Sequence, residues 1–439
     1  MKLPTKSQAR ESVLSALERA RANDAKWKSG RTFSLVYWAG DDVLQLLHDA
    51  FFAYFSENAL NPMAFPSLRR FENEVVAMSG ALLGHENTFG AMTSGGTESI
   101  LMAVKTARDW ARESMPRVSD PEIVVPASVH PAFEKAGHYF GVRVVHAPLD
   151  ESMRADVAAM RELVTPKTIM LVGSSPAYPH GVIDPIEDIA SLAQENKILC
   201  HVDACVGGFM LPFARKLGRA IPPFDFSVPG VTSMSADVHK YGWAAKGASV
   251  ILYRTRELRR HQYVAYTDWP GGLYGSPSAP GTRPGGPIAA AWAVMNYLGE
   301  EGYVRLAKKT LDTSDEILAG IRSIPELEVL GDPAMSVFAF GSQSLDVYAL
   351  GDAMQALGWY LDRQQRPASL HMMITPAHEK IAGEVIADLK KCVASVKSGK
   401  TSEGSAAMYG MLGAMPDRAA VRDLVLEVLD GFGVDGTTT

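Results

Sequence analysis

The stretch from residue 123 to residue 204 alternates short apolar runs with segments of helical periodicity. The apolar runs predict strands at 123–126, 142–148, 168–173 and 198–204. The segments between them predict helices at 131–140, 155–163 and 186–194. Strands this apolar are typical of parallel sheets buried on both faces, and parallel neighbours need crossover connections such as these helices. The pattern therefore predicts an α/β fold with a mostly parallel sheet between two layers of helices.

A chain of 439 residues is too long for one small core and suits one large and one smaller domain. We predict an N-terminal helical segment (1–60), a large domain (61–290) and a small C-terminal α+β domain (291–439) with an antiparallel sheet. Periodicity predicts the remaining helices at 42–54, 68–83, 288–298, 304–321, 347–357 and 418–429, and the remaining strands at 327–330, 335–340, 359–362 and 370–374.

Three stretches rich in Gly, Pro, Ser or Thr are predicted to be irregular. The region 267–286 is predicted to be an ordered loop, because Trp269 and Tyr274 are interleaved with its Gly and Pro residues. The polar stretch 397–407 is predicted to be a loop. We expect the Gly/Thr tail after the last helix to be disordered.

Composition limits the function classes. A net charge of −6 provides no nucleic-acid-binding signature. Cys200, Cys205 and Cys392 show no metal-ligand spacing, so we expect no metal site, and so few cysteines favour a reducing cytoplasm. No apolar run is long enough to span a membrane, and the N-terminus has no signal-peptide core. Residues 1–31 predict an exposed basic helix; its narrow apolar stripe favours a solvated helix or an arm on a partner subunit over a membrane-surface anchor.

Lys240 is the first candidate for chemistry. It lies in Ser233–Gly247, between two β-like runs at 231–235 and 248–253, so we expect the fold to hold it inside. Burial disfavours a charged ammonium, and a neutral lysine amine forms Schiff bases with carbonyls, including that of pyridoxal phosphate. The alternative is a lysine that caps the end of a strand.

Two further stretches carry candidate binding residues. Thr93-Ser-Gly-Gly-Thr-Glu-Ser99 opens a predicted helix, where backbone N–H groups can bind a phosphate, although Ser, Thr and Gly also simply cap helices. Asp203 ends an apolar strand and needs a cationic partner, such as a protonated pyridine nitrogen or a salt-bridging side chain. Thr97, His130 and Tyr178 also follow predicted strands, and ligands of parallel sheets bind beyond such strand ends.

Taken in order, Ser94-Gly-Gly-Thr-Glu-Ser99, Ser128-Val-His130, His201-Val-Asp-Ala-Cys205 and Ala236-Asp-Val-His-Lys240 resemble the pyridoxal-phosphate-dependent enzymes of the aspartate aminotransferase fold (fold type I), in their decarboxylase-like group. The chain is more closely similar to the sphingosine-1-phosphate lyases, through Pro179–Pro185, His239–Gly247, Thr267–Pro277 and Thr282–Gly286. The resemblance runs from about Val36 to about Gly413. Having no N-terminal span, the chain resembles the soluble bacterial members, and Asn61 stands where the family has a histidine.

This resemblance implies a homodimer with pyridoxal phosphate at sites in the subunit interface. It implies that Lys240 carries the cofactor as a Schiff base, that Asp203 pairs with the pyridine nitrogen and that His130 stacks on the ring. The cofactor phosphate would be held by Gly96, Thr97, His239 and Thr282, the last across the interface. The reaction implied is the retro-aldol cleavage of a phosphorylated long-chain base to a long-chain aldehyde and phosphoethanolamine.

For the substrate phosphate, Lys246 is the predicted clamp, with hydroxyl donors from Tyr37 and Tyr178. Asn61 and Arg283 are further candidates, although a salt bridge within its own loop explains Arg283 as well. The general base stays open between Lys240, His201 and a tyrosine. Two alternatives stay open as well, namely a pyridoxal-phosphate-dependent amino-acid decarboxylase and a non-catalytic binding or scaffold protein with this fold.

Overall fold

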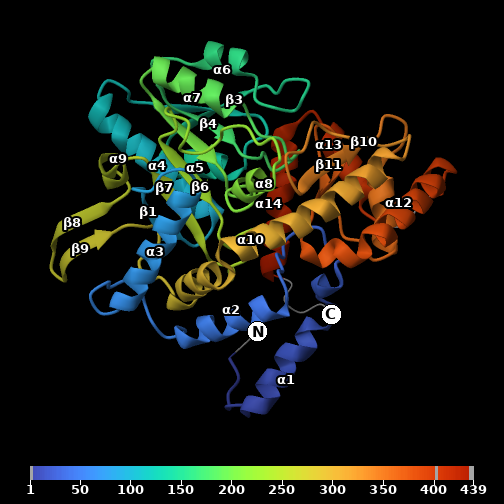
Figure 1. Cartoon of the computed structure of the whole chain (residues 1–439), viewed down its shortest axis with the longest axis horizontal. Helices are drawn as coiled ribbons and strands as arrows, with labels where there is room; N and C mark the ends of the chain where they lie inside the picture. Colours follow the sequence, from blue (N-terminus) through green and yellow to red (C-terminus); the bar gives the residue numbers. More distant parts are fainter. Residues whose placement is uncertain (1–2, 401–403, 435–439) are drawn as a thin grey trace.

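The computed structural model describes residues 3–400 and 404–434. A seven-stranded sheet runs through the larger part of the chain, in the order β1-β7-β6-β5-β4-β2-β3 (Figure 1). All neighbours from β6 to β3 pair in parallel, while β7 pairs antiparallel with both β1 and β6, so β7 alone runs against the others. The strands are β1 (Phe89–Thr93), β2 (Glu122–Pro126), β3 (Arg143–Ala147), β4 (Thr168–Ser174), β5 (Leu199–Asp203), β6 (Ser233–Ala236) and β7 (Ser249–Tyr253).

Helices cover both faces of this sheet, as predicted. Val125 and Val172 point into one buried cluster, which contains residues of α4 and α5, while Val124 and Leu171 point into the opposite cluster, which contains residues of α3, α6, α7, α8 and α10. Because successive residues of a strand face opposite sides, apolar residues at every position are what a doubly covered sheet requires. These helices are α3 (Pro66–Leu82), α4 (Gly96–Ser114), α5 (Ala132–Phe140), α6 (Val157–Leu163), α7 (Ile186–Glu195), α8 (Leu211–Lys216) and α10 (Gly285–Arg322), with α2 (Asp41–Ala53) packed on α10 and α9 (Arg256–Arg260) on β7.

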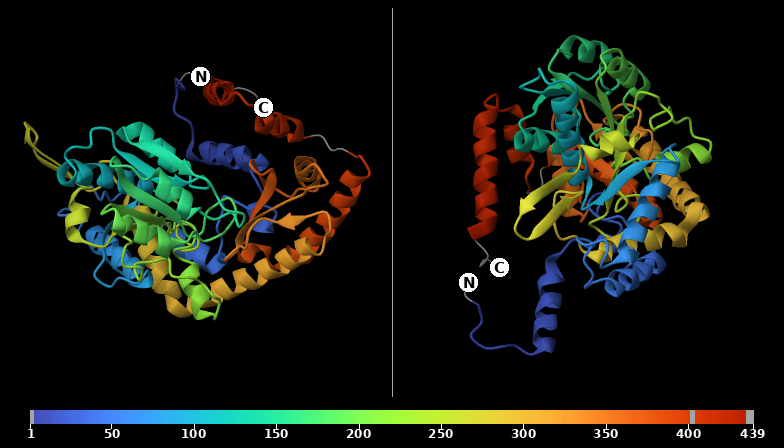
Figure 2. Two further views of the ribbon diagram at one scale, coloured as in Figure 1. Left: turned by 90° about the horizontal axis from the view of Figure 1, so that it is seen from above. Right: turned by 90° about the vertical axis from the view of Figure 1, so that its left-hand side faces the viewer.

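A second, smaller sheet follows α10 and is antiparallel throughout, which confirms the predicted α+β architecture of the C-terminal part. Its order is β10-β11-β13-β12, and it packs with α11 and α12 around a separate core. The elements are β10 (Glu328–Val329), β11 (Val337–Gly341), α11 (Val347–Ala356), β12 (Asp362–Gln364), β13 (Ser369–Met373) and α12 (Ala382–Lys397). The predicted boundary at residue 290 falls inside α10, which extends from one sheet to the other (Figure 2).

The two sheets approach each other closely at Gly181. This residue has φ of +72°, and a Cβ there would lie 1.7 Å from the carbonyl oxygen of Val337 in β11. Only glycine tolerates both conditions. The loop after β4, which carries Tyr178, is therefore held directly against the smaller sheet.

Three irregular or helical predictions differ from the structure. The region predicted as an ordered loop contains an exposed hairpin, β8 (Val264–Trp269) and β9 (Gly272–Ser276), whose aromatic residues pair across the strands. The two helices predicted at 288–298 and 304–321 form one element, α10, with non-helical dihedral angles only at Gly299. The predicted loop 397–407 includes the start of α13 (Ala406–Ala414).

A helix lies near each end of the part of the chain that the structure describes. Of the predicted basic helix over 1–31, α1 (Arg10–Ala20) is helical and has no buried residue, and it projects from the body (Figure 1). The last helix, α14 (Arg418–Val434), is longer than predicted, and the tail 435–439 lies outside the described residues. Among residues 3–400 and 404–434, no helix is long and apolar enough to cross a membrane.

Candidate active site

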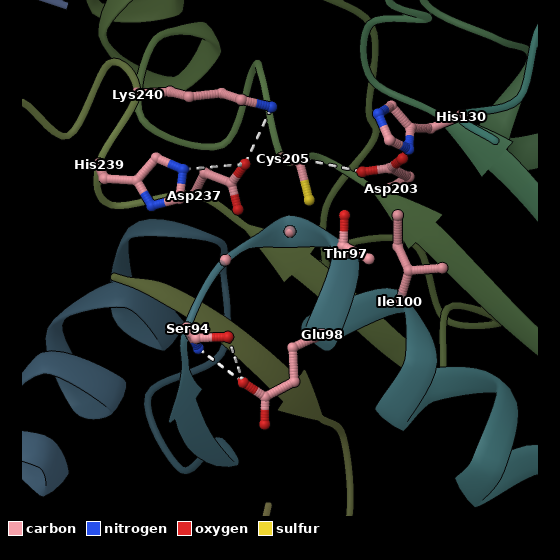
Figure 3. Close-up of a pocket in the computed structure, with 12 residues that line it drawn as sticks. Ser94, Thr97, Glu98, Ile100, His130, Asp203, Cys205, Asp237, His239 and Lys240 are labelled. Atoms are coloured by element: carbon pink, nitrogen blue, oxygen red, sulfur yellow. Dashed lines mark hydrogen bonds and ion pairs between the residues drawn. The ribbon is translucent and has the colours of Figure 1, made fainter. Parts of the chain in front are cut away.

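A cavity of about 360 Å³ opens where β1, β2, β5 and β6 end at the same edge of the large sheet (Figure 3). Each strand is followed by residues that line it: the loop after β1, His130 after β2, Asp203 at the end of β5 and Lys240 after β6. The volume lies in the range of small-molecule sites. The prediction that these side chains meet at the carboxyl ends of the strands is confirmed, because parallel strands bring those ends together.

The cradle of the cavity is the turn from β1 into α4. Ser94, Gly95, Gly96 and Thr97 line it, and the N-terminus of α4, with its unpaired backbone N–H groups, faces the cavity. A Cβ on Gly96 would lie 2.8 Å from Asp237 Oδ2 and 2.9 Å from Cys205 Sγ, so glycine is required there. The Glu98 carboxylate folds back onto this turn and accepts hydrogen bonds from the Ser94 backbone N–H and hydroxyl, both at 2.7 Å.

Lys240 forms an ion pair that the sequence reasoning missed. Its Nζ lies 2.9 Å from Oδ2 of Asp237, a carboxylate that is 2% exposed. Burial acts to lower the pKa of Lys240, but the charge of Asp237 outweighs it and the pKa is raised. The expectation that this lysine loses its proton easily is therefore wrong for the free enzyme. Asp237 lies three residues before Lys240 in the same motif, and that spacing was the available signal.

Asp237 keeps one oxygen without a partner. Its Oδ1 is buried and makes no hydrogen bond within the described residues. Burial acts to raise its pKa, but the charge of Lys240 outweighs it and the pKa is lowered, so this carboxylate is ionised. His239 lies 3.8 Å away, and burial lowers its pKa to about 4. One buried anion thus faces both Lys240 and the cradle.

Asp203 and His130 form the opposite wall. Asp203 Oδ1 accepts a hydrogen bond from the Cys205 backbone N–H at 3.0 Å and from the Ser235 hydroxyl at 3.3 Å. The His130 ring accepts at Nδ1 from the Ala132 backbone N–H at 3.1 Å, and burial lowers the pKa of His130. His130 is thus a neutral ring with a fixed orientation on the cavity wall.

A second cavity of about 250 Å³ shares Lys240, Asp203 and His130 with the first. Lys246 and Tyr37 line it, with the Lys246 Nζ 4.8 Å from the centroid of the Tyr37 ring. Partial desolvation of its ammonium, together with the positive charge of Lys240, lowers the pKa of Lys246 to about 8. This predicted clamp therefore lies beside the predicted cofactor lysine and is charged at neutral pH.

Tyr178 also lines the second cavity, but its hydroxyl proton is already used in a hydrogen bond outside the cavity lining. Its hydroxyl donates to Oδ2 of Asp362 at 3.2 Å. A tyrosine hydroxyl carries a single proton, so Tyr178 offers oxygen lone pairs to a ligand. The prediction that it donates to a substrate phosphate is therefore wrong for this arrangement.

Four other predicted site residues lie outside both cavities. His201 lies within β5 and is fully buried, with its ring nitrogens 2.9 Å and 3.3 Å from the hydroxyls of Ser233 and Ser235, and cannot reach a ligand. Arg283 forms a salt bridge with Glu72 at 2.7 Å, and because Glu72 lies in α3 this differs from the expected salt bridge within its own loop.

Asn61 and Thr282 lie on the surface of the single chain. The side-chain oxygen of Asn61 caps its own loop by accepting from the Met63 backbone N–H at 2.9 Å. The Thr282 hydroxyl lies 3.4 Å from the side-chain amide of Asn58. Besides Asp237, the lining residues that sequence reasoning missed include Ser34, Cys205 and Met373. Ser34 and Met373 belong to segments without a recognised motif, and Cys205 belongs to a motif that was interpreted only for its aspartate.

Comparison with known proteins covers the whole chain. Residues 2–343 match the family described as pyridoxal-dependent decarboxylase conserved domain. Sphingosine-1-phosphate lyase from Arabidopsis thaliana is 46% identical over 98% of this chain and 80% of its own length, and sphingosine-1-phosphate lyase 1 from Rattus norvegicus is 42% identical over 98% and 76%.

Solved structures give the same picture. That of the Burkholderia pseudomallei sphingosine-1-phosphate lyase superposes with a TM-score of 0.92 at 40% identity, covering 100% of this chain and 98% of that one. Glutamate decarboxylase from Lactobacillus brevis, with a TM-score of 0.79 at 18% identity over 90% of this chain and 95% of that one, shares the fold.

Proposed function

Because the chain belongs to the sphingosine-1-phosphate lyases, within the pyridoxal-dependent decarboxylase family, we propose that it cleaves the C2–C3 bond of a phosphorylated long-chain base. The products are a long-chain aldehyde and phosphoethanolamine. The observation that carries this proposal is the second lysine: Lys246 lies in a cavity continuous with that of Lys240, where it can hold a phosphate at the reacting end of the substrate.

The residues of the larger cavity fit pyridoxal phosphate, which is the cofactor of this family. The glycine cradle at the N-terminus of α4 suits its phosphate, the Lys240 amine suits its aldehyde and the Asp203 carboxylate suits its pyridine nitrogen. When bound, the cofactor acts as an electron sink for the pair left on C2 as the C2–C3 bond breaks.

We assign Lys240 Nζ the proton transfers, since His201 cannot reach the cavity. With the cofactor bound, the substrate amine would take the place of this nitrogen, and the lysine amine so freed could then accept the proton of the C3 hydroxyl. Asp237, at 2.9 Å, stabilises the ammonium that results. The same ammonium can return a proton to C2 before phosphoethanolamine leaves, so one pair of side chains handles both steps.

Lys246 and Tyr37 are assigned to the substrate phosphate. The bond that breaks is the one aligned with the electron sink, so the substrate must be held in one orientation. Lys246 supplies a positive charge, and the Tyr37 hydroxyl, whose proton is directed only at Met373 Sδ at 3.5 Å, remains free to donate. A thioether is a weak acceptor, so a phosphate oxygen competes with it easily.

We further infer a homodimer in which a second copy covers the surface around Asn61 and Thr282. Three large apolar side chains lie exposed on the same segment as Asn61: Phe52 at 70%, Phe55 at 65% and Met63 at 77%. Side chains of this size gathered on one face are typical of an interface. Light scattering during gel filtration tests this inference, and a monomer at micromolar concentration would contradict it.

A cytoplasmic location is part of the same proposal. It is supported by Cys200, Cys205 and Cys392, which are all buried as free thiols. Fractionation of cells that produce the protein would test it, and recovery with a secreted or membrane fraction would contradict it.

The experiment for the proposed reaction is an assay of the purified holoenzyme with sphingosine 1-phosphate. Aldehyde and phosphoethanolamine, measured by mass spectrometry, should appear together. Release of carbon dioxide from amino acids, with no aldehyde from sphingosine 1-phosphate, would replace the lyase with the decarboxylase alternative. Absence of both activities and of any cofactor absorbance would favour the non-catalytic reading.

A further inference from the structure

One carboxylate in the smaller sheet holds two hydroxyls of the second cavity. Asp362, at the start of β12, accepts a hydrogen bond from Tyr178 at 3.2 Å and another from Ser34 at 3.1 Å. Tyr178 comes from the loop after β4, Ser34 from the N-terminal segment, and both line the cavity that contains Lys246. Asp362 therefore joins three segments at the wall of the proposed substrate site without lining it.

The histidine behind this group cannot supply a proton to Asp362. His371 of β13 is fully buried, and burial lowers its pKa to about 4, so it is neutral. Its Nε2 lies 3.0 Å from the carbonyl oxygen of Tyr178, which requires the single ring proton there. Its Nδ1, 4.0 Å from Asp362 Oδ2, is then without a proton and has no partner. The proton donors to Asp362 are thus the two hydroxyls.

This arrangement sets the polarity of one wall of the cavity. Burial raises the pKa of Asp362, while the hydrogen bonds from Ser34 and Tyr178 act to lower it. In its ionised form this carboxylate only accepts, so Tyr178 and Ser34 both point their protons at it and turn lone pairs toward the cavity. Burial, together with the charge of Asp362, raises the pKa of Tyr178, so its proton stays in place at neutral pH. A phosphate, which also accepts, gains nothing from such a wall, whereas a hydroxyl group of a ligand gains a partner.

Two other groups that line the cavity have the reverse polarity. Lys246 offers N–H donors, and the Tyr37 hydroxyl has only a sulfur acceptor. The lining thus offers donors at Lys246 and Tyr37 and acceptors at Tyr178 and Ser34. A phosphorylated 2-amino-1,3-diol has the matching order of groups, with an anionic phosphate at one end and a C3 hydroxyl two carbons further on.

We propose that Asp362 is a positioning residue that holds Tyr178 and Ser34 as hydrogen-bond acceptors for the C3 hydroxyl of the substrate. This inference rests on the proposed lyase function. It adds to that function the residues that recognise the C3 hydroxyl of the substrate. It separates the recognition of the hydroxyl, through Asp362, from the recognition of the phosphate, through Lys246. This hydroxyl has a single proton, which it donates to one of the two oxygens when the substrate binds and must turn to Lys240 Nζ, once that amine is freed, before the C2–C3 bond breaks.

The test is Asp362→Ala, which frees both hydroxyls to rotate. One well-placed hydrogen bond contributes about 1 kcal/mol, so kcat/KM for sphingosine 1-phosphate should fall about 3- to 10-fold. The inhibition constants of inorganic phosphate and of a 3-deoxy analogue, which lacks the C3 hydroxyl, should stay within about 2-fold of wild type. Weaker inhibition by inorganic phosphate would show that Tyr178 donates to phosphate and would overturn the proposal, as would an unchanged kcat/KM.

Two further variants separate positioning from folding. Asp362→Asn keeps one acceptor oxygen and nearly the same shape, so it should give an intermediate loss. In a Tyr178→Phe background, Asp362→Ala should lower kcat/KM clearly less than it does in wild type, since one of the two hydroxyls that Asp362 holds is already absent. Fully additive losses would contradict action through Tyr178.

Asp346→Ala is the matched control, because Asp346 caps α11, away from both cavities, by accepting from the Tyr348 backbone N–H at 2.9 Å. It should lower stability and leave kcat/KM for sphingosine 1-phosphate unchanged.

Failure of the proposed reaction would be seen separately. Binding of the hydroxylated ligand and of its 3-deoxy analogue can be followed in the holoenzyme by the change in cofactor absorbance, without turnover. A wild-type enzyme that binds both ligands but forms no aldehyde would refute the lyase function alone. A wild-type enzyme that binds the two ligands equally would refute the role of Asp362 alone.

Discussion

Replacing Lys246 with methionine removes one charge from the substrate cavity and keeps most of the side-chain volume. A hydrogen bond from a charged donor contributes about 1.5 to 3 kcal/mol. Because Lys246 is partly in contact with solvent, we take the lower half of that range. At pH 7, kcat/KM for sphingosine 1-phosphate should therefore fall about 10- to 50-fold.

The size of this loss should depend on pH. The pKa of Lys246 is lowered to about 8, so about nine-tenths of its amine is protonated at pH 7 and about one-tenth at pH 9. The charged form is the one that binds phosphate, so the wild-type advantage is present below pH 8 and is lost as the pH rises through that value. The profile of kcat/KM reports the groups that titrate in the enzyme before substrate binds.

The assay compares wild type and Lys246→Met on the phosphorylated base, from pH 6.5 to 9.5, and measures the inhibition constant of inorganic phosphate alongside. The ratio of the two kcat/KM values should shrink toward 1 above pH 9, and phosphate inhibition should weaken in the variant at pH 7. Lys216→Met is the control, because Lys216 pairs with Glu300 at 2.6 Å outside both cavities. An equal loss on a dephosphorylated analogue, or a loss independent of pH, would refute the clamp.

Three other predictions concern single residues. Lys240→Ala should abolish turnover and the absorbance of the bound cofactor. A variant with normal activity would contradict the assignment of Lys240 as the residue that binds the cofactor. Asn61→His should leave turnover intact or raise it, while loss of the loop cap lowers stability by about 1 kcal/mol; a complete loss of activity would show that Asn61 is matched to a different ligand. Glu72→Gln should destabilise the fold by about 3 kcal/mol, seen as a lower Tm, because Arg283 and Glu72 are only 12% and 14% exposed, and an unchanged Tm would contradict this account of the pair.

The parts of the fold that the sequence predicts well are those in which one local pattern has one structural outcome. Strands β2, β4 and β5 are mostly apolar and are buried at every position, and such runs between helices favour the centre of a parallel sheet. From that architecture alone, Asp203, His130 and the 94–97 turn were expected at one edge of the sheet, where the structure has them.

The parts that were missed depend on contacts between distant segments or on competing local signals. Nothing local to Asp362 indicates that it meets Tyr178, since the contact requires the smaller sheet to pack against the loop after β4. The hairpin β8–β9 was predicted as a loop because its Gly and Pro content outweighed the aromatic pairs that hold it together. Lys240 was predicted to be neutral because burial was considered without the carboxylate of Asp237, one helical turn away in sequence.

The measurement that tests the central claim most directly is cleavage of sphingosine 1-phosphate by the purified holoenzyme in deuterated water. Breaking the C2–C3 bond leaves C2 to be protonated by the enzyme, whose exchangeable protons are then deuterons. Phosphoethanolamine should carry one carbon-bound deuterium, the aldehyde should carry none at its carbonyl carbon, and the two should form in equal amounts. Products without deuterium in phosphoethanolamine, unequal yields, or the same products from the Lys240→Ala variant would contradict a cleavage carried out at this site.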